Sequence, residues 1–78
     1  MNRSISQIAY EIKRDWAKPN YAAAPYLDAM TGINSINDMY FADSAREVVL
    51  RFLSNASTWR GETAKRIKKE LKALAGVQ

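Results

Sequence analysis

The chain has 78 residues, of which 47% are hydrophobic and 26% are charged, and these fractions are ordinary for one globular domain. It contains no cysteine and no histidine, which excludes disulfides, Cys/His zinc sites and nucleophiles activated by histidine. No apolar run approaches the roughly 20 residues of a membrane span, and the N-terminal residues do not resemble a secretory signal. We therefore expect a single domain over residues 1–78, in the cytoplasm and without a membrane partner.

Two helices are predicted in the first third of the chain. Ser4 and Gln7 have the spacing of a capping box, and Ile5, Ile8, Ala9, Ile12 and Trp16 follow at helical spacing. Because Pro19 disfavours helix in the residue before it, the first helix is placed at about 4–17. Pro25 suits the first turn of a helix and Gly32 suits a C-terminal cap, so a short helix is expected at about 24–31.

The middle segment is harder to interpret because Asn and Ser interrupt it twice, which favours turns. The apolar residues Ile33, Ile36, Met39 and Tyr40 nevertheless fall at helical spacing. We interpret this segment as a single helical turn at about 35–40.

The second half of the chain predicts two longer amphipathic helices. Ser44 and Glu47 have capping-box spacing and open a helix at about 44–56, with Glu47 and Arg51 paired on its outer side. Ser57 or Thr58 is expected to cap the last helix, at about 58–75. The predicted fold is all-α, a small bundle of three amphipathic helices plus a short helix or turn, as a monomer or weak homodimer.

The net charge of +4 is concentrated at the C-terminal end. Residues 1–57 are neutral, whereas residues 58–78 hold six basic and two acidic side chains. In the last helix the apolar seam faces away from five cations, namely Lys65, Arg66, Lys68, Lys69 and Lys72. One interpretation is a solvated outer face, and the other is a surface that neutralises nucleic-acid phosphates without reading sequence.

Trp59 also has two interpretations. A large aromatic side chain in a helix connection usually packs inward, here as a lid over Phe52 and Trp16. Alternatively, Trp59 and Arg60 form an exposed interface anchor. Tyr10 and Arg14 on the first helix are a separate candidate patch for contact with a partner. The candidate partner-binding residues are therefore Trp59, Arg60, Tyr10 and Arg14. Gly61 is expected to allow close approach of another backbone.

Features of an enzyme are missing from the sequence. No pair of carboxylates is spaced as an acid/base couple, and no Gly-rich phosphate loop or metal-binding loop is present. The segment 55–61 is somewhat longer than the turn of a helix-turn-helix motif, which needs about 3–4 residues, unless the last helix already starts at Thr58. We expect a non-enzymatic protein without a cofactor or a metal ion.

Three stretches of the chain have distinctive amino-acid sequences. They are Ile8–Ile12 with Asp15-Trp16, Ala24–Met30, and above all Phe52–Gly61, which contains the string Asn-Ala-Ser-Thr-Trp-Arg-Gly and leads into Lys68–Lys72. With these stretches the sequence resembles a family of small, largely uncharacterised proteins of bacteriophages, prophages and other mobile elements. The resemblance covers nearly the whole chain and implies a genetic context, but it transfers no catalytic or binding residue.

These observations predict a small phage or mobile-element protein that binds a host or phage protein in the bacterial cytoplasm. The alternative is a nucleic-acid-binding accessory protein that uses the last helix. A third hypothesis is a purely structural role, such as a homodimeric scaffold.

Overall fold

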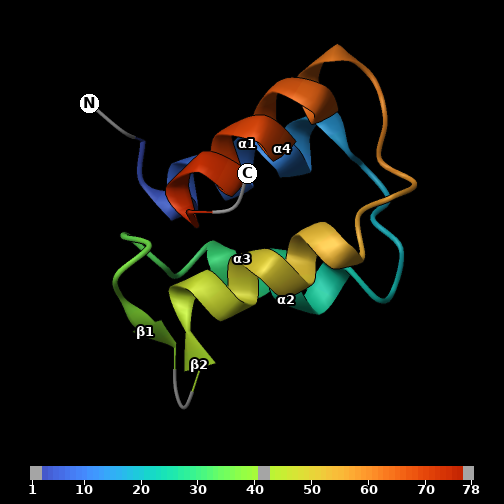
Figure 1. Ribbon diagram of the computed structural model, residues 1–78. Coiled ribbons are helices and arrows are strands. Elements are labelled where there is room, and N and C mark those ends of the chain that lie inside the picture. Colours follow the sequence, from blue (N-terminus) through green and yellow to red (C-terminus); the bar gives the residue numbers. More distant parts are fainter. Residues whose placement is uncertain (1–2, 41–42, 77–78) are drawn as a thin grey trace.

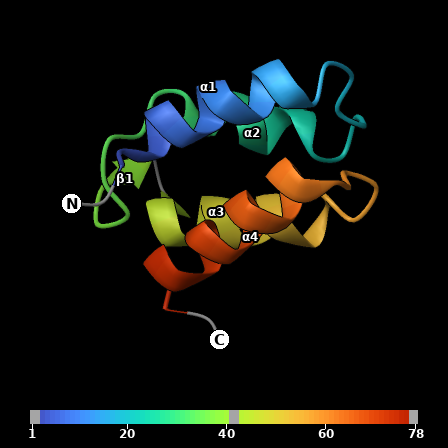
Figure 2. The same ribbon diagram turned by 90° about the horizontal axis from the view of Figure 1, so that it is seen from above.

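The structure is a computed structural model that describes residues 3–40 and 43–76. Its elements, in chain order, are α1 (Ile5–Asp15), α2 (Ala24–Met30), β1 (Met39–Tyr40), β2 (Asp43–Ser44), α3 (Ala45–Ser54) and α4 (Glu62–Leu74). Helices α1 and α4 form one layer, and α2 and α3 form the other (Figure 1). Each helix contacts the next one along the chain, and α4 closes the arrangement against α1 (Figure 2). The predicted all-α bundle is confirmed.

The core fills the space between the two layers. Its largest fully buried side chains come from all four helices and from the segment after α2: Phe52, Ile5, Ile8, Ile12, Leu27, Met30, Ile33, Ile67, Leu71 and Val49. No polar or charged side chain of the described residues is buried among them. The burial of apolar side chains is therefore the main force that holds the helices together. Each large side chain contributes about 1.5–3 kcal/mol to the free energy of unfolding.

The helix starts follow the capping residues in α1 and α3. Ser4 accepts a hydrogen bond from the Gln7 backbone at 3.1 Å, and the Gln7 side chain accepts one from the Ser4 backbone at 3.0 Å. Ser44 accepts from the Glu47 backbone at 3.1 Å, and the Glu47–Arg51 pair is present at 3.7 Å. Helix α1 ends at Asp15, two residues before the predicted end, because Trp16 leaves the helical conformation (φ −108°, ψ 86°).

The predicted helical turn at 35–40 is wrong. Asp38 instead holds a polar turn, since its carboxylate accepts hydrogen bonds from the backbones of Asn34 (3.2 Å) and Ser35 (3.0 Å). Met39–Tyr40 then pairs antiparallel with Asp43–Ser44. The helical spacing of the apolar residues was misleading because Asp38 offers the backbone a competing set of partners.

The predicted start of the last helix is also wrong, since α4 begins at Glu62 and not near Thr58. Residues 56–59 form a tight turn, in which the Trp59 N–H donates to the Ala56 carbonyl at 3.1 Å. Gly61 then adopts φ 116° and ψ 179°, a conformation essentially restricted to glycine, and precedes the helix as its N-cap. A Cβ atom added at Gly61 would meet no heavy atom within 4 Å, so the role of this glycine is conformational and not the expected close approach.

Replacing Gly61 by alanine is expected to lower the free energy of unfolding by about 1–3 kcal/mol, because alanine is strained at this φ. Gly32→Ala is the matched control, since Gly32 has no positive φ and an added methyl group would make an ordinary 3.7 Å contact with the Ala29 carbonyl. Urea denaturation of both variants measures the difference. Equal losses at the two glycines would contradict the conformational role of Gly61.

Candidate functional site

Trp59 is part of the core. Its side chain is 3% exposed and stacks on Trp16, with the ring centroids 5.7 Å apart and the planes 6° from parallel. Phe52 packs edge-on against Trp59, with the ring centroids 6.4 Å apart. The indole N–H of Trp59 donates to the Asp15 carboxylate at 2.8 Å. The prediction of a lid over Phe52 and Trp16 is confirmed, and the interpretation of Trp59 as an exposed anchor is wrong.

The other three predicted partner-binding residues are exposed. Tyr10 is 56% exposed and lies one helical turn before Arg14 on the outer side of α1. Arg60 lies on the connection before α4. Trp59 and Arg60 therefore do not form an exposed anchor together, whereas Tyr10 and Arg14 are both accessible on α1.

The outer side of α4 carries the exposed cations. Lys65, Lys69 and Lys72 are exposed and fall within one narrow arc of the helix, opposite the buried Ala64, Ile67 and Leu71. Lys68 lies at the edge of this arc, where its ammonium group donates to the Trp59 carbonyl at 2.6 Å. We call Arg60, Lys65, Lys68, Lys69 and Lys72 the α4 basic face.

Arg66, the remaining predicted phosphate contact, is turned toward α1. It donates to the Glu11 carboxylate, which also accepts from Arg3. The Arg3 guanidinium in turn forms a two-pronged contact with Glu70, at 3.1 Å and 2.7 Å. Arg66 therefore serves the α1–α4 contact, and the structure does not support its assignment to the phosphate-binding surface.

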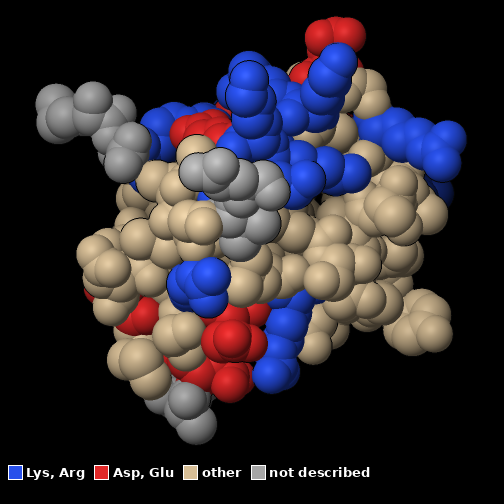
Figure 3. Space-filling model, in the orientation of Figure 1, with Lys and Arg blue, Asp and Glu red and all other residues tan. Residues whose placement is uncertain are grey.

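This network changes the charge balance of α4. Glu70 is neutralised by Arg3, so Glu62 is the only acidic side chain of α4 outside the network. The pKa of Lys68 lies below its usual value because partial burial removes water from the ammonium group and because Lys72 and Arg60 are like charges nearby. Figure 3 shows Lys and Arg gathered over α4, on the side away from β1 and β2.

The Arg3–Glu11–Arg66 contacts predict a specific pH dependence. The hydrogen bond from Arg3, and to a smaller extent the one from Arg66, holds the pKa of Glu11 below its usual value. The stability that this carboxylate contributes is complete above its unfolded pKa of about 4.3 and is lost as the pH falls through its lower folded pKa.

Glu11→Gln should therefore lose less unfolding free energy than the wild type when the pH falls from about 5 to about 3. Urea denaturation at a series of pH values measures this difference. Identical curves for the wild type and Glu11→Gln would contradict the assignment.

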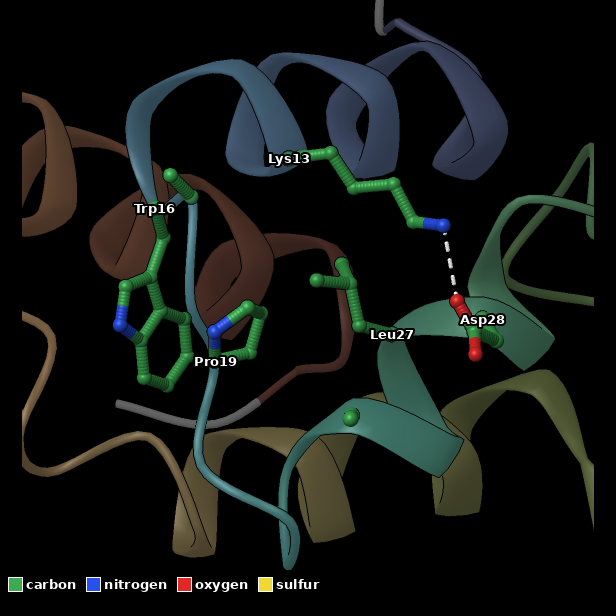
Figure 4. A pocket seen from close by; sticks show the side chains of 7 residues that line it. Lys13, Trp16, Pro19, Leu27 and Asp28 are labelled. Carbon is green, nitrogen blue, oxygen red and sulfur yellow. Dashed lines mark hydrogen bonds and ion pairs between the residues drawn. The ribbon is translucent and has the colours of Figure 1, made fainter.

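A cleft lies between the end of α1 and the start of α2, with a volume of about 350 Å³. Trp16, Pro19 and Leu27 line it, and Lys13 donates to Asp28 at 2.8 Å across its rim (Figure 4). The carboxylate of Asp28 is therefore paired with an ammonium group. No pattern in the sequence indicated this cleft, because its walls come from separate elements.

Comparisons with protein-family models, with curated proteins and with solved structures find no match for this chain. No helix among the described residues is long and apolar enough to cross a membrane. The resemblance to phage and mobile-element proteins stays a prediction.

Proposed function

We propose that this chain is a small, non-enzymatic protein of phage or mobile-element origin that binds nucleic acid through the α4 basic face in the bacterial cytoplasm. The origin is supported by the sequence resemblance, above all by residues 52–61. The binding role is supported by the clustering of cations along one side of α4. A row of lysines of this kind neutralises phosphates and releases their counterions, which favours association.

The observation that carries this proposal is the pairing of Glu70 with Arg3. A solvated helix face normally mixes both signs of charge, and Glu70 would supply the opposite sign in the second half of α4. Its two contacts with Arg3 cancel that charge from the α1 side. Glu70 also lies on another side of the helix from Lys65, Lys69 and Lys72. None of these three lysines has an acidic partner in the described part of the chain.

The helix macrodipole does not account for the whole cluster. Cations are favoured near the C-terminal end of a helix, which suits Lys72. Arg60, however, lies just before α4 and Lys65 lies near its N-terminal end, where the macrodipole is unfavourable to positive charge. These two residues raise the positive potential of the surface at a small cost in stability, which is consistent with a role in binding an anion.

Fluorescence anisotropy with a labelled DNA duplex of about 20 base pairs tests the proposal. At about 150 mM salt we expect a dissociation constant of roughly 1–100 μM, the range of non-specific protein–DNA association. Unlabelled DNA of unrelated sequence should displace the labelled duplex equally well, because the basic face lacks Asn and Gln to read base edges. Failure to bind any nucleic acid in this range would contradict the proposal.

The second candidate function is contact with a host or phage protein, and the exposure of Tyr10 favours it. Tyr10 and Arg14 are residue types enriched at interface hot spots, and both are accessible on α1, while Arg60 is accessible before α4. This candidate has lost the support of Trp59, which is buried. It becomes the leading hypothesis if nucleic acid does not bind.

A further inference from the structure

The α4 basic face offers cations but no aromatic ring to an incoming strand. Trp59 is the only aromatic residue between positions 55 and 76, and it is 3% exposed. It stacks on Trp16, and the ammonium group of Lys68 lies 5.8 Å from its ring centroid. Proteins that hold single-stranded nucleic acid gain about 1–3 kcal/mol per base from stacking on aromatic side chains. That contribution is not available on this face.

The helix that carries these cations is held in place by side-chain contacts. Lys65 and Lys72 are seven residues apart and therefore about 10 Å apart along the helix axis, a distance that covers about three phosphates of one DNA strand. Arg3 and Arg66 tie α4 to α1, and Lys68 ties it to the connection before the helix. Cations at regular intervals along a held helix suit a partner whose phosphates are themselves regularly spaced.

A single strand would have to be ordered onto this row. The ordering costs conformational entropy, and neither stacking nor base-edge contacts would offset it here. A duplex presents its phosphates already ordered. B-form DNA also has a major groove wide enough to accept an α-helix between its backbones, whereas the major groove of an RNA duplex is deep and narrow.

From these observations we infer that the α4 basic face binds the sugar–phosphate backbone of double-stranded DNA, in preference to single strands and to RNA duplexes. The inference rests on the proposed function and specifies the ligand of the same surface. The molecule measures 28 × 26 × 20 Å, so one copy covers about eight base pairs of 3.4 Å each. Binding is independent of sequence.

A competition experiment with the full chain tests this inference. The wild-type protein is bound to a labelled DNA duplex of about 20 base pairs and displaced by the unlabelled duplex, by each separated strand or by an RNA duplex of the same sequence. At equal phosphate concentration, the strands and the RNA duplex should need at least about a tenfold higher concentration for half displacement. The variant Lys65→Glu/Lys69→Glu should lose binding to the DNA duplex. This loss would show that the duplex binds to the α4 basic face.

The outcomes separate the inference from the proposed function. If a single strand or the RNA duplex competes as well as the DNA duplex, the inference is overturned while nucleic-acid binding stands. If the labelled duplex, the strands and the RNA duplex all fail to bind, the proposed function fails with it. If DNA binding survives Lys65→Glu/Lys69→Glu, the duplex contacts another surface and the inference is overturned.

Discussion

Replacing Trp59 by alanine is expected to lower the free energy of unfolding by about 3–5 kcal/mol, as for other large aromatic residues in a core. The side chain packs on Trp16 and Phe52 and is 3% exposed, so its removal leaves a cavity at one end of the bundle. A domain of this size has a total stability of roughly 5–10 kcal/mol. The variant should therefore retain only a small part of the wild-type stability.

Trp59→Phe is the control that separates packing from hydrogen bonding. Phenylalanine keeps an aromatic ring between Trp16 and Phe52, but it cannot donate to the Asp15 carboxylate. The expected loss is about 1–2 kcal/mol, the sum of one hydrogen bond and a smaller buried area. Urea denaturation followed by far-UV circular dichroism measures both variants. If Trp59→Ala were as stable as the wild type, Trp59 would not be a core residue.

Reversing two charges on the α4 basic face is expected to weaken DNA binding by at least about 30-fold at physiological salt, because each lost cation removes a phosphate contact and each glutamate adds repulsion. The substitutions are Lys65→Glu and Lys69→Glu, at two exposed positions of α4. Neither lysine takes part in an ion pair among the described residues, so the fold should be preserved.

Arg14→Glu/Lys18→Glu is the matched control for net charge. Both pairs of substitutions lower the net charge of the chain from +4 to 0, and both replace exposed side chains. The control should weaken DNA binding much less than Lys65→Glu/Lys69→Glu does, because Arg14 and Lys18 are not part of the α4 basic face. Equal losses in the two variants would mean that overall charge, and not the α4 face, determines binding.

The elements predicted well from the sequence are those that local interactions specify. Ser4 with Gln7, and Ser44 with Glu47, place the starts of α1 and α3 to within one residue. In both helices the apolar spacing also identifies the buried side, because a helix surface repeats every 3.6 residues. Local caps and periodicity therefore sufficed for these two helices.

The elements predicted poorly depend on contacts that the local sequence does not contain. The start of α4 is set by the burial of Trp59 against Trp16, more than forty residues earlier, and by the conformation of Gly61. The short strand pair follows from the turn that Asp38 organises. Because tertiary contacts override local preferences at these points, periodicity alone misplaced both boundaries.

The candidate site was predicted in composition but not in arrangement. The spacing of Lys65, Lys69 and Lys72 on one side of the last helix was evident from the sequence. The pairing of Arg3 with Glu70 could not be predicted from the sequence, because the two residues are 67 positions apart. The contact of Arg66 with Glu11 could not be predicted either. These two contacts determine which charges of α4 remain for a partner.

The salt dependence of duplex binding tests the proposed role of the α4 basic face most directly. With Arg60, Lys65, Lys69 and Lys72 as phosphate contacts, a plot of log K against log salt concentration should have a slope of about −3 to −4. The slope should become shallower by about two in Lys65→Ala/Lys69→Ala, one unit for each lost contact. A slope near zero, or an unchanged slope in the double variant, would contradict nucleic-acid binding by this face.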